Sequence, residues 1–105
     1  MVTLADSPAV LHCSGDEDRS TQSLRRPALS RALAVNEDLT VDFTGLEFAD
    51  TSLMLDLVMI ARRLRAAGHA MLLRRAAPQI LTLIEIVGLD RLDGVEFDRR
   101  PAATA

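Results

Sequence analysis

The stretch Phe48–Met54, with the sequence Phe-Ala-Asp-Thr-Ser-Leu-Met, decides how this chain is organised. A strand-like alternation ends in it, and a long helical pattern begins. Asp50, Thr51 and Ser52 supply side-chain oxygens where the first backbone N–H groups of a helix lack partners within the helix. One interpretation is therefore a helix N-cap. The other is that one of the two hydroxyls is a regulated acceptor of phosphate.

The segment from Thr51 to Ala67, ended by Gly68, has the strongest helical periodicity in the chain. One wide face is expected to be buried and holds Leu53, Met54, Leu57, Val58, Ile60, Ala61 and Leu64. The opposite face is expected to hold Ser52, Asp56, Arg63 and Ala66, together with Leu55 and Met59. An outward Leu and Met beside a hydroxyl at a helix start indicate a docking surface. The alternative is the scatter of single apolar residues that most protein surfaces carry.

The remaining elements alternate strands with helices. We expect strands at 2–4, 9–13, 39–43, 70–73 and 95–97, and helices at 21–35 and from 78 to a stop at Gly88; residues 46–48 carry the chain on to Phe48–Met54. Because proline is tolerated only in the first turn of a helix, Pro27 predicts that the regular part of the first helix begins near Arg26. Right-handed crossovers between such strands predict an α/β domain, with a mostly parallel sheet and helices packed against it.

Composition limits the classes of function. A chain of 105 residues with 49% hydrophobic and 26% charged residues reads as one soluble domain, with about 99–105 a disordered tail. A net charge of −3 argues against a nucleic-acid partner, and every basic residue is Arg. The single Cys13, the lack of a secretory signal and the lack of a long apolar segment predict a cytoplasmic protein without membrane insertion.

Few residues suit catalysis or metal binding. Strand alternation places His12 and Cys13 on opposite faces, so they are not expected to act as a dyad, and Cys13 is expected in the core. The polar loop 14–21 carries three carboxylates, but its spacing lacks the ligand alternation and the glycine of a calcium loop. We therefore expect no metal and no cofactor. The arginine pairs, Arg25-Arg26 among them, are interpreted as solvated surface.

Three segments, in this order and spacing, resemble the STAS domains, a family named for sulfate transporters and bacterial anti-sigma factor antagonists. Residues 10–18 resemble a strand that ends in the family's Gly-Glu-Leu-Asp type of loop. Residues 41–52 are similar to its strand and Asp-Ser-Ser phosphorylation loop, and residues 84–92 to its last helix and Gly-Leu turn. The resemblance implies a STAS-like sheet of about four to five mostly parallel strands.

The resemblance also implies roles for individual residues. The phosphoacceptor of the family falls on Ser52, with Thr51 as the second choice, and the acids near it fall on Asp50 and Asp18. The residues expected to bind a partner are Leu53, Leu55, Asp56 and Met59. The family commonly continues with Gly-Leu-Gly, whereas this chain has Leu53-Met54-Leu55. Large residues in place of glycine either change the fit of the partner or indicate that phosphorylation has been lost.

The function implied is that of an anti-sigma factor antagonist, which regulates transcription that depends on a sigma factor. It would bind an anti-sigma factor with kinase activity through the helix that begins at Thr51-Ser52. Phosphate on Ser52 would add about two negative charges beside Leu55 and Met59 and release the partner. The alternative is a non-phosphorylated adaptor, for example in a phospholipid-transport ABC complex. Leu55 and Met59 would equally suit a weak homodimer, while the lack of a Gly-rich phosphate loop argues against an independent enzyme.

Overall fold

The computed structural model describes residues 1–98 of the chain. Five strands form one sheet in the order β1-β2-β4-β6-β7. Their bounds are Val2–Ala5 (β1), Val10–Cys13 (β2), Leu39–Asp42 (β4), Met71–Arg74 (β6) and Val95–Asp98 (β7). β1 runs antiparallel to β2, and the other neighbours are parallel. The predicted α/β fold with a mostly parallel sheet is confirmed.

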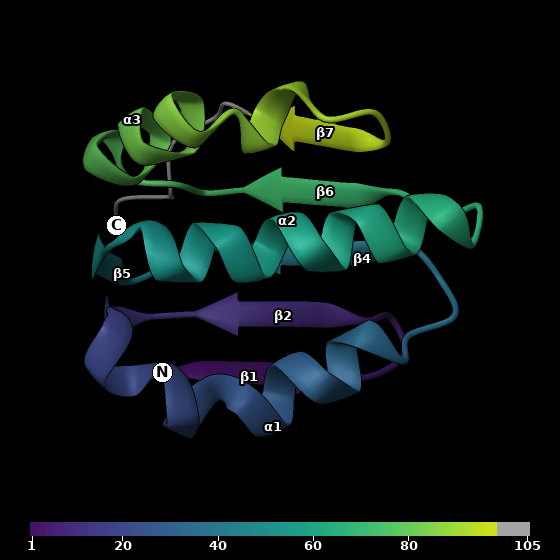
Figure 1. Ribbon diagram of the computed structural model, residues 1–105, viewed down its shortest axis with the longest axis horizontal. Coiled ribbons are helices and arrows are strands. Elements are labelled where there is room, and N and C mark those ends of the chain that lie inside the picture. The colour runs from purple at the N-terminus through teal and green to yellow at the C-terminus, as the bar shows by residue number, and fades with distance from the viewer. Residues whose placement is uncertain (99–105) are drawn as a thin grey trace.

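Three helices provide the crossovers between the parallel strands: α1 (Gln22–Leu33), α2 (Thr51–Ala66) and α3 (Pro78–Val87). Each crossover moves one strand further in the same direction along the sheet, so right-handed connections bring the helices to one face. Figure 1 shows α2 lying across the middle of the sheet, with α1 alongside it. α2 is therefore the central helix of the layer.

The core lies between this helix layer and the sheet. Leu11, Val41 and Leu73 face each other across β2, β4 and β6, and none is exposed to solvent. His12 points to the open face of the sheet and is exposed, whereas Cys13 is fully buried, as the alternation predicts. From α2 the core receives Leu53, Met54, Leu57, Ile60, Ala61 and Leu64.

A second, two-stranded sheet pairs β3 (Gly15–Glu17) with β5 (Leu46–Ala49) in parallel. β3 begins two residues after β2 ends, and β5 leads directly into α2. The Asp50 N–H donates to the Glu17 carbonyl at 3.1 Å. A short 3₁₀ turn, Arg19–Thr21, then leads into α1. The stretch 14–21, expected to be a polar loop, thus contains a strand and a 3₁₀ turn and is held against the start of α2.

α1 begins at Gln22, four residues before the expected start near Arg26, and Pro27 is its sixth residue. The prediction was wrong because the 3₁₀ turn Arg19–Thr21 leads directly into α1, so the helix is already in its second turn at Pro27. Pro27 lacks the N–H that would bond the Ser23 carbonyl, and Ser23 is exposed, so water can bond that carbonyl instead. The tail expected at about 99–105 lies outside the described residues.

Candidate functional site

Asp50 caps the N-terminus of α2. Its Oδ1 accepts hydrogen bonds from the Ser52 N–H at 2.9 Å and from the Ser52 hydroxyl, and its Oδ2 accepts from the Arg19 N–H at 3.0 Å. The pKa of Asp50 is lowered, chiefly because the Ser52 hydroxyl bonds the carboxylate; the two N–H donors and the Arg25 charge add to this and outweigh the effect of desolvation. The N-cap predicted for this stretch is confirmed.

The two neighbouring hydroxyls differ in exposure. Ser52 is only 8% exposed, and its hydroxyl also accepts a hydrogen bond from Arg25 Nη2 at 2.9 Å. Ser52 was expected on the outward face of α2, and this placement is wrong, because the side chain points toward α1. Thr51, the first residue of α2, is exposed, and no side-chain hydrogen bond to it is present within residues 1–98.

Arg25 lies at the centre of the site, 1% exposed, although its pair with Arg26 was predicted to be solvated. Arg26 is exposed, so that prediction is wrong for Arg25 alone. Besides Ser52, the Arg25 guanidinium bonds Asp56 Oδ2 at 2.9 Å, the Asp18 carbonyl at 2.8 Å, Thr21 Oγ1 at 3.2 Å and Glu17 Oε1 at 3.4 Å. We call these six residues, with Asp50, the Arg25 network. It ties β3 and α1 to the first turn of α2.

A sequence signal for Arg25 exists. It stands three, four and seven residues before Ala28, Leu29 and Ala32, which places it on the buried stripe of α1. Glu17, which is 3% exposed, gives no such signal, since β3 has only three residues and depends on β5 for its position. The burial of Arg25 is therefore predictable from helical periodicity, whereas the burial of Glu17 is seen only in the tertiary structure.

Asp18 contacts the site through its backbone, while its carboxylate is bonded to Ser20. The carboxylate caps the 3₁₀ turn by accepting from the Ser20 N–H at 2.8 Å. Its backbone carbonyl is the group that contacts Arg25. Asp18 thus reaches Ser52 only through the Arg25 guanidinium.

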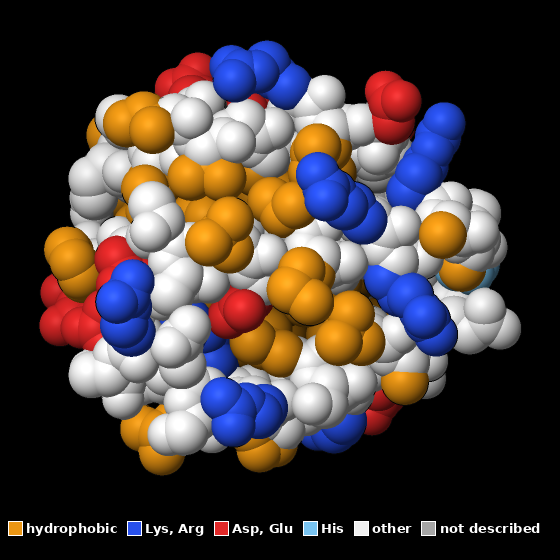
Figure 2. Space-filling model, in the orientation of Figure 1, with side chains coloured by type: hydrophobic (Ala, Val, Ile, Leu, Met, Phe, Trp, Pro, Cys, Tyr) orange, Lys and Arg blue, Asp and Glu red, His pale blue; other side chains and the backbone are white. Residues whose placement is uncertain are grey.

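The four residues predicted to bind a partner lie in different environments. Leu55 and Met59 are 57% and 61% exposed, one helical turn apart. Asp56 is partly exposed and paired with Arg25. Leu53 is fully buried in the core, so its prediction as a contact residue is wrong for this conformation. Figure 2 shows apolar side chains along the face that α2 crosses, with arginine side chains bordering the half where the helix ends.

Other polar clusters are paired among themselves. At the end of β4, Asp42 is 3% exposed and bonds Arg74 Nε at 2.9 Å. Burial raises the pKa of Asp42, but hydrogen bonds from Thr44 and Arg74 outweigh it, so the net direction is down. In the part of the chain that the structure describes, no group of three or more His, Cys, Asp or Glu side chains is placed to hold a metal ion.

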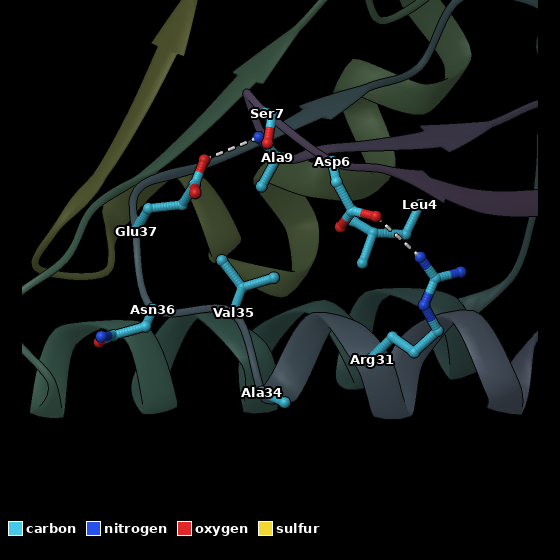
Figure 3. Close-up of a pocket in the computed structure, with 9 residues that line it drawn as sticks. All are labelled: Leu4, Asp6, Ser7, Ala9, Arg31, Ala34, Val35, Asn36 and Glu37. Carbon is cyan, nitrogen blue, oxygen red and sulfur yellow. Dashed lines mark hydrogen bonds and ion pairs between the residues drawn. The ribbon is translucent and has the colours of Figure 1, made fainter.

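A polar cavity of about 390 Å³ lies at the opposite end of the sheet from Ser52, where α1 ends and β2 begins (Figure 3). Arg31 pairs there with Asp6 at 3.3 Å, and Glu37 accepts from the Ala9 N–H at 2.9 Å. These contacts join the β1–β2 turn to the end of α1. Across residues 1–98, the helices are too short or too polar to cross a membrane.

The sequence matches the model of a protein family described as MlaB, STAS domain, over residues 1–95. The chain belongs to the STAS domain family. The match covers the whole sheet up to the first residue of β7, and all three helices. A search of curated proteins found no match to this STAS domain.

Solved structures share the fold. The anti-sigma factor antagonist SpoIIAA in its unphosphorylated form superposes with a TM-score of 0.65 and 21% identity, covering 90% of this chain and 99% of that chain. The Bacillus cell fate determinant SpoIIAA in the phosphorylated form gives 0.65 and 19%, covering 95% and 93%. A STAS domain protein from Planctomyces limnophilus gives 0.67 and 15%, covering 95% and 90%. At these identities the likeness shows the fold of the STAS domain.

Proposed function

We propose that this STAS domain is a protein-binding module without catalytic activity of its own, and that it acts as an anti-sigma factor antagonist. The observation that carries the proposal is the exposure of Leu55 and Met59 on the outer face of α2, next to the Asp50-Thr51-Ser52 segment. Two large apolar side chains on one helix face gain free energy when a partner covers them. The partner is an anti-sigma factor with kinase activity.

Regulation follows from where this surface lies. Phosphate attached at the start of α2 would meet the positive end of the helix dipole and its backbone N–H donors, so the fold accepts it at that end. It would also place about two negative charges one turn from Leu55, and an apolar contact excludes an unpaired charge. Phosphorylation in the Asp50-Thr51-Ser52 segment therefore releases the partner. Ser52 is the residue that corresponds to the phosphoacceptor of the family.

Binding is tested by pull-down of candidate anti-sigma factor kinases with the wild type and with Leu55→Glu combined with Met59→Glu. We expect the double variant to keep its free energy of unfolding and to lose at least about tenfold in affinity, which corresponds to about 1.4 kcal/mol. Leu24→Glu is the matched control, because Leu24 is 78% exposed on α1. A double variant that binds as tightly as the control contradicts the assignment of α2 as the docking face.

The phosphorylation step is tested by comparing partner binding by the wild type with binding by two variants of Ser52. Ser52→Asp is expected to weaken binding and Ser52→Ala to preserve it, while intact-mass measurement after incubation with ATP and the kinase reports the modification. Equal binding by the wild type and both variants, together with an unchanged mass, removes the phosphorylation step and leaves the docking step in place.

A second candidate function is that of a constitutive adaptor subunit, for example in a phospholipid-transport ABC complex. Two observations favour it: the hydroxyl of Ser52 is buried and doubly hydrogen-bonded, and the matched family model carries the description MlaB. Co-purification distinguishes the two functions. A histidine-kinase-like ATPase supports the antagonist, whereas a transporter ATPase bound through Leu55 and Met59 supports the adaptor.

A further inference from the structure

Thr51 and Ser52 carry neighbouring hydroxyls at the start of α2, and these two hydroxyls lie in different environments. The Ser52 hydroxyl donates to Asp50 and accepts from Arg25, so both of its hydrogen-bonding roles are taken inside the protein. The Thr51 side chain is exposed at the first position of the helix. The difference comes from α1, which carries Arg25 across to the inner side of Ser52.

We propose that Arg25 determines which of these hydroxyls is modified: it holds Ser52 within the Arg25 network and leaves Thr51 as the hydroxyl that a kinase reaches in the folded protein. This inference rests on the proposed function, because it concerns the regulation of the same docking surface. Arg25 acts through Ser52 and touches no substrate, so it is a positioning residue.

Releasing Ser52 would require Arg25 to leave its other partners as well. Glu17 is 3% exposed and Asp56 is partly exposed, and both face the Arg25 charge. A guanidinium that turned away would remove the Arg25 charge from Asp56 and from the buried Glu17 carboxylate, which would keep only the Met1 ammonium at 2.7 Å, and this loss is unfavourable. A phosphate on Ser52 would lie beside the Asp50 carboxylate and compete with Asp56 and Glu17 for one guanidinium. Ser52 is therefore both shielded from a kinase and poorly suited to carry the product.

Thr51 has none of these constraints. In the step proposed, the Thr51 hydroxyl oxygen attacks the γ-phosphorus of ATP, and a new Oγ1–P bond forms. The bond from that phosphorus to the oxygen bridging to the β-phosphorus breaks, ADP leaves, and the hydroxyl proton passes to the catalytic base of the kinase. The phosphothreonine then lies at the outer end of α2, where the helix dipole favours an anion.

A first experiment uses the chain alone, with phosphothreonine installed at 51 or phosphoserine at 52 by genetic-code expansion. Hydrogen exchange is measured across residues 15–33. We expect the protein phosphorylated at 51 to keep the protection of the unmodified chain. The protein phosphorylated at 52 should lose at least about tenfold in protection there, since Arg25 is drawn out of the network. Unchanged protection with phosphate at 52 overturns the role of Arg25.

A second experiment uses the anti-sigma factor kinase isolated by pull-down, with ATP and peptide mass spectrometry. In the wild type and in Arg26→Ala we expect phosphate on Thr51. In Thr51→Val we expect the amount of phosphate incorporated into the chain to fall at least tenfold. Arg25→Met combined with Glu17→Gln removes buried charge of both signs, so the variant can fold, and it should now accept phosphate on Ser52. Phosphate on Ser52 of the wild type, with Thr51 unmodified, overturns the inference. If the chain binds no kinase, the proposed function is contradicted instead. The hydrogen-exchange experiment then still tests the role of Arg25, because it uses the chain alone.

Discussion

Arg25 is a buried cation whose hydrogen bonds reach two separate segments of the chain, residues 17–21 and 52–56. Its guanidinium faces the carboxylates of Glu17 and Asp56 directly, and that of Asp50 through the Ser52 hydroxyl. Such a network stabilises the fold only while all its members are present, because removing one of them leaves buried charge without a partner. We therefore expect substitutions of the adjacent residues Arg25 and Arg26 to differ widely in their effect on the free energy of unfolding.

Arg25→Ala is expected to lower the free energy of unfolding by about 3 kcal/mol, because Asp56 and the buried Glu17 would lose the guanidinium between them and Glu17 would keep only the Met1 ammonium. Arg26→Ala, at an exposed position of the same helix, should change it by no more than about 0.5 kcal/mol. Urea unfolding of both variants measures the difference. Equal effects would show that the Arg25 network adds nothing to stability.

Asp50 combines a cap with a lowered pKa. Asp50→Ala is expected to cost about 1 kcal/mol through loss of the cap. Because the pKa of Asp50 is lowered from its ordinary value of 3.8 in the folded state, its charge contributes stability fully above that pH, and the contribution is lost as pH falls below it. Asp50→Asn keeps a capping oxygen, so it should lose this acid dependence while retaining part of the cap. Unfolding curves between pH 2 and 6 would reveal the difference.

Cys13 is expected to make stability fall at alkaline pH. Burial, assisted by the Glu17 charge, raises the pKa of the Cys13 thiol from 9.0 to about 12. The stability contributed by the neutral thiol is fully present below about pH 9 and is lost as pH rises toward 12. The chain has no Lys and no Tyr, so little else titrates in this window. Cys13→Ala should abolish the decline, and native Cys13 should resist alkylation at pH 8.

At the scale of the elements, glycine fixes where the helices end. α3 ends at Gly88 with φ +84°, and α2 is followed by Gly68 with φ +82°. Both conformations lie in the left-handed region, which is costly for a residue with a Cβ. The two sites differ in their surroundings, since a Cβ at Gly68 would meet nothing within 4 Å, while one at Gly88 would lie 3.1 Å from Arg91 Nη2.

Gly68→Ala is therefore expected to cost roughly 1–2 kcal/mol from backbone strain alone. Gly88→Ala should cost at least as much, because the exposed Arg91 side chain must also move. Thermal or urea unfolding checks both values. A neutral result at Gly68 would mean that the turn relaxes to another conformation.

At the scale of the whole molecule, the sheet has a protected centre and two edges. β4 lies between β2 and β6 under α2, whereas β1 and β7 each pair on one side only. Amide groups in β4 and β6 bond neighbours on both sides and open only when the core opens. The antiparallel β1 also carries the N-terminal ammonium of Met1 close to Glu17, at 2.7 Å.

Native-state hydrogen exchange is expected to be slowest in β4 and β6 and fastest in β1 and β7. The amides of β3 should exchange at a rate set by the Arg25 network, so Arg25→Met combined with Glu17→Gln should speed exchange in β3 and leave β6 unchanged. Faster exchange in β6 as well would show that the network and the core open together.

The sequence by itself determined most of the architecture. The alternation around Leu11 and Val41, the helical periodicity from Thr51 to Ala66 and the stop at Gly88 predicted elements that the structure contains. These signals are local, because side-chain direction repeats every two residues in a strand and about every 3.6 in a helix. The N-cap at Asp50 was predictable for the same reason, as was the outward direction of Leu55 and Met59.

Only the tertiary structure decided which hydroxyl is accessible. Ser52 was assigned to the outer surface from the geometry of one helix, but its burial depends on Arg25, which lies on α1 and reaches it through space. The same holds for Glu17, whose short strand exists only against β5. Contacts between segments 8 to 31 residues apart leave no periodic trace in the chain. The sequence therefore specified a helix start with two hydroxyls, and packing distinguished Thr51 from Ser52.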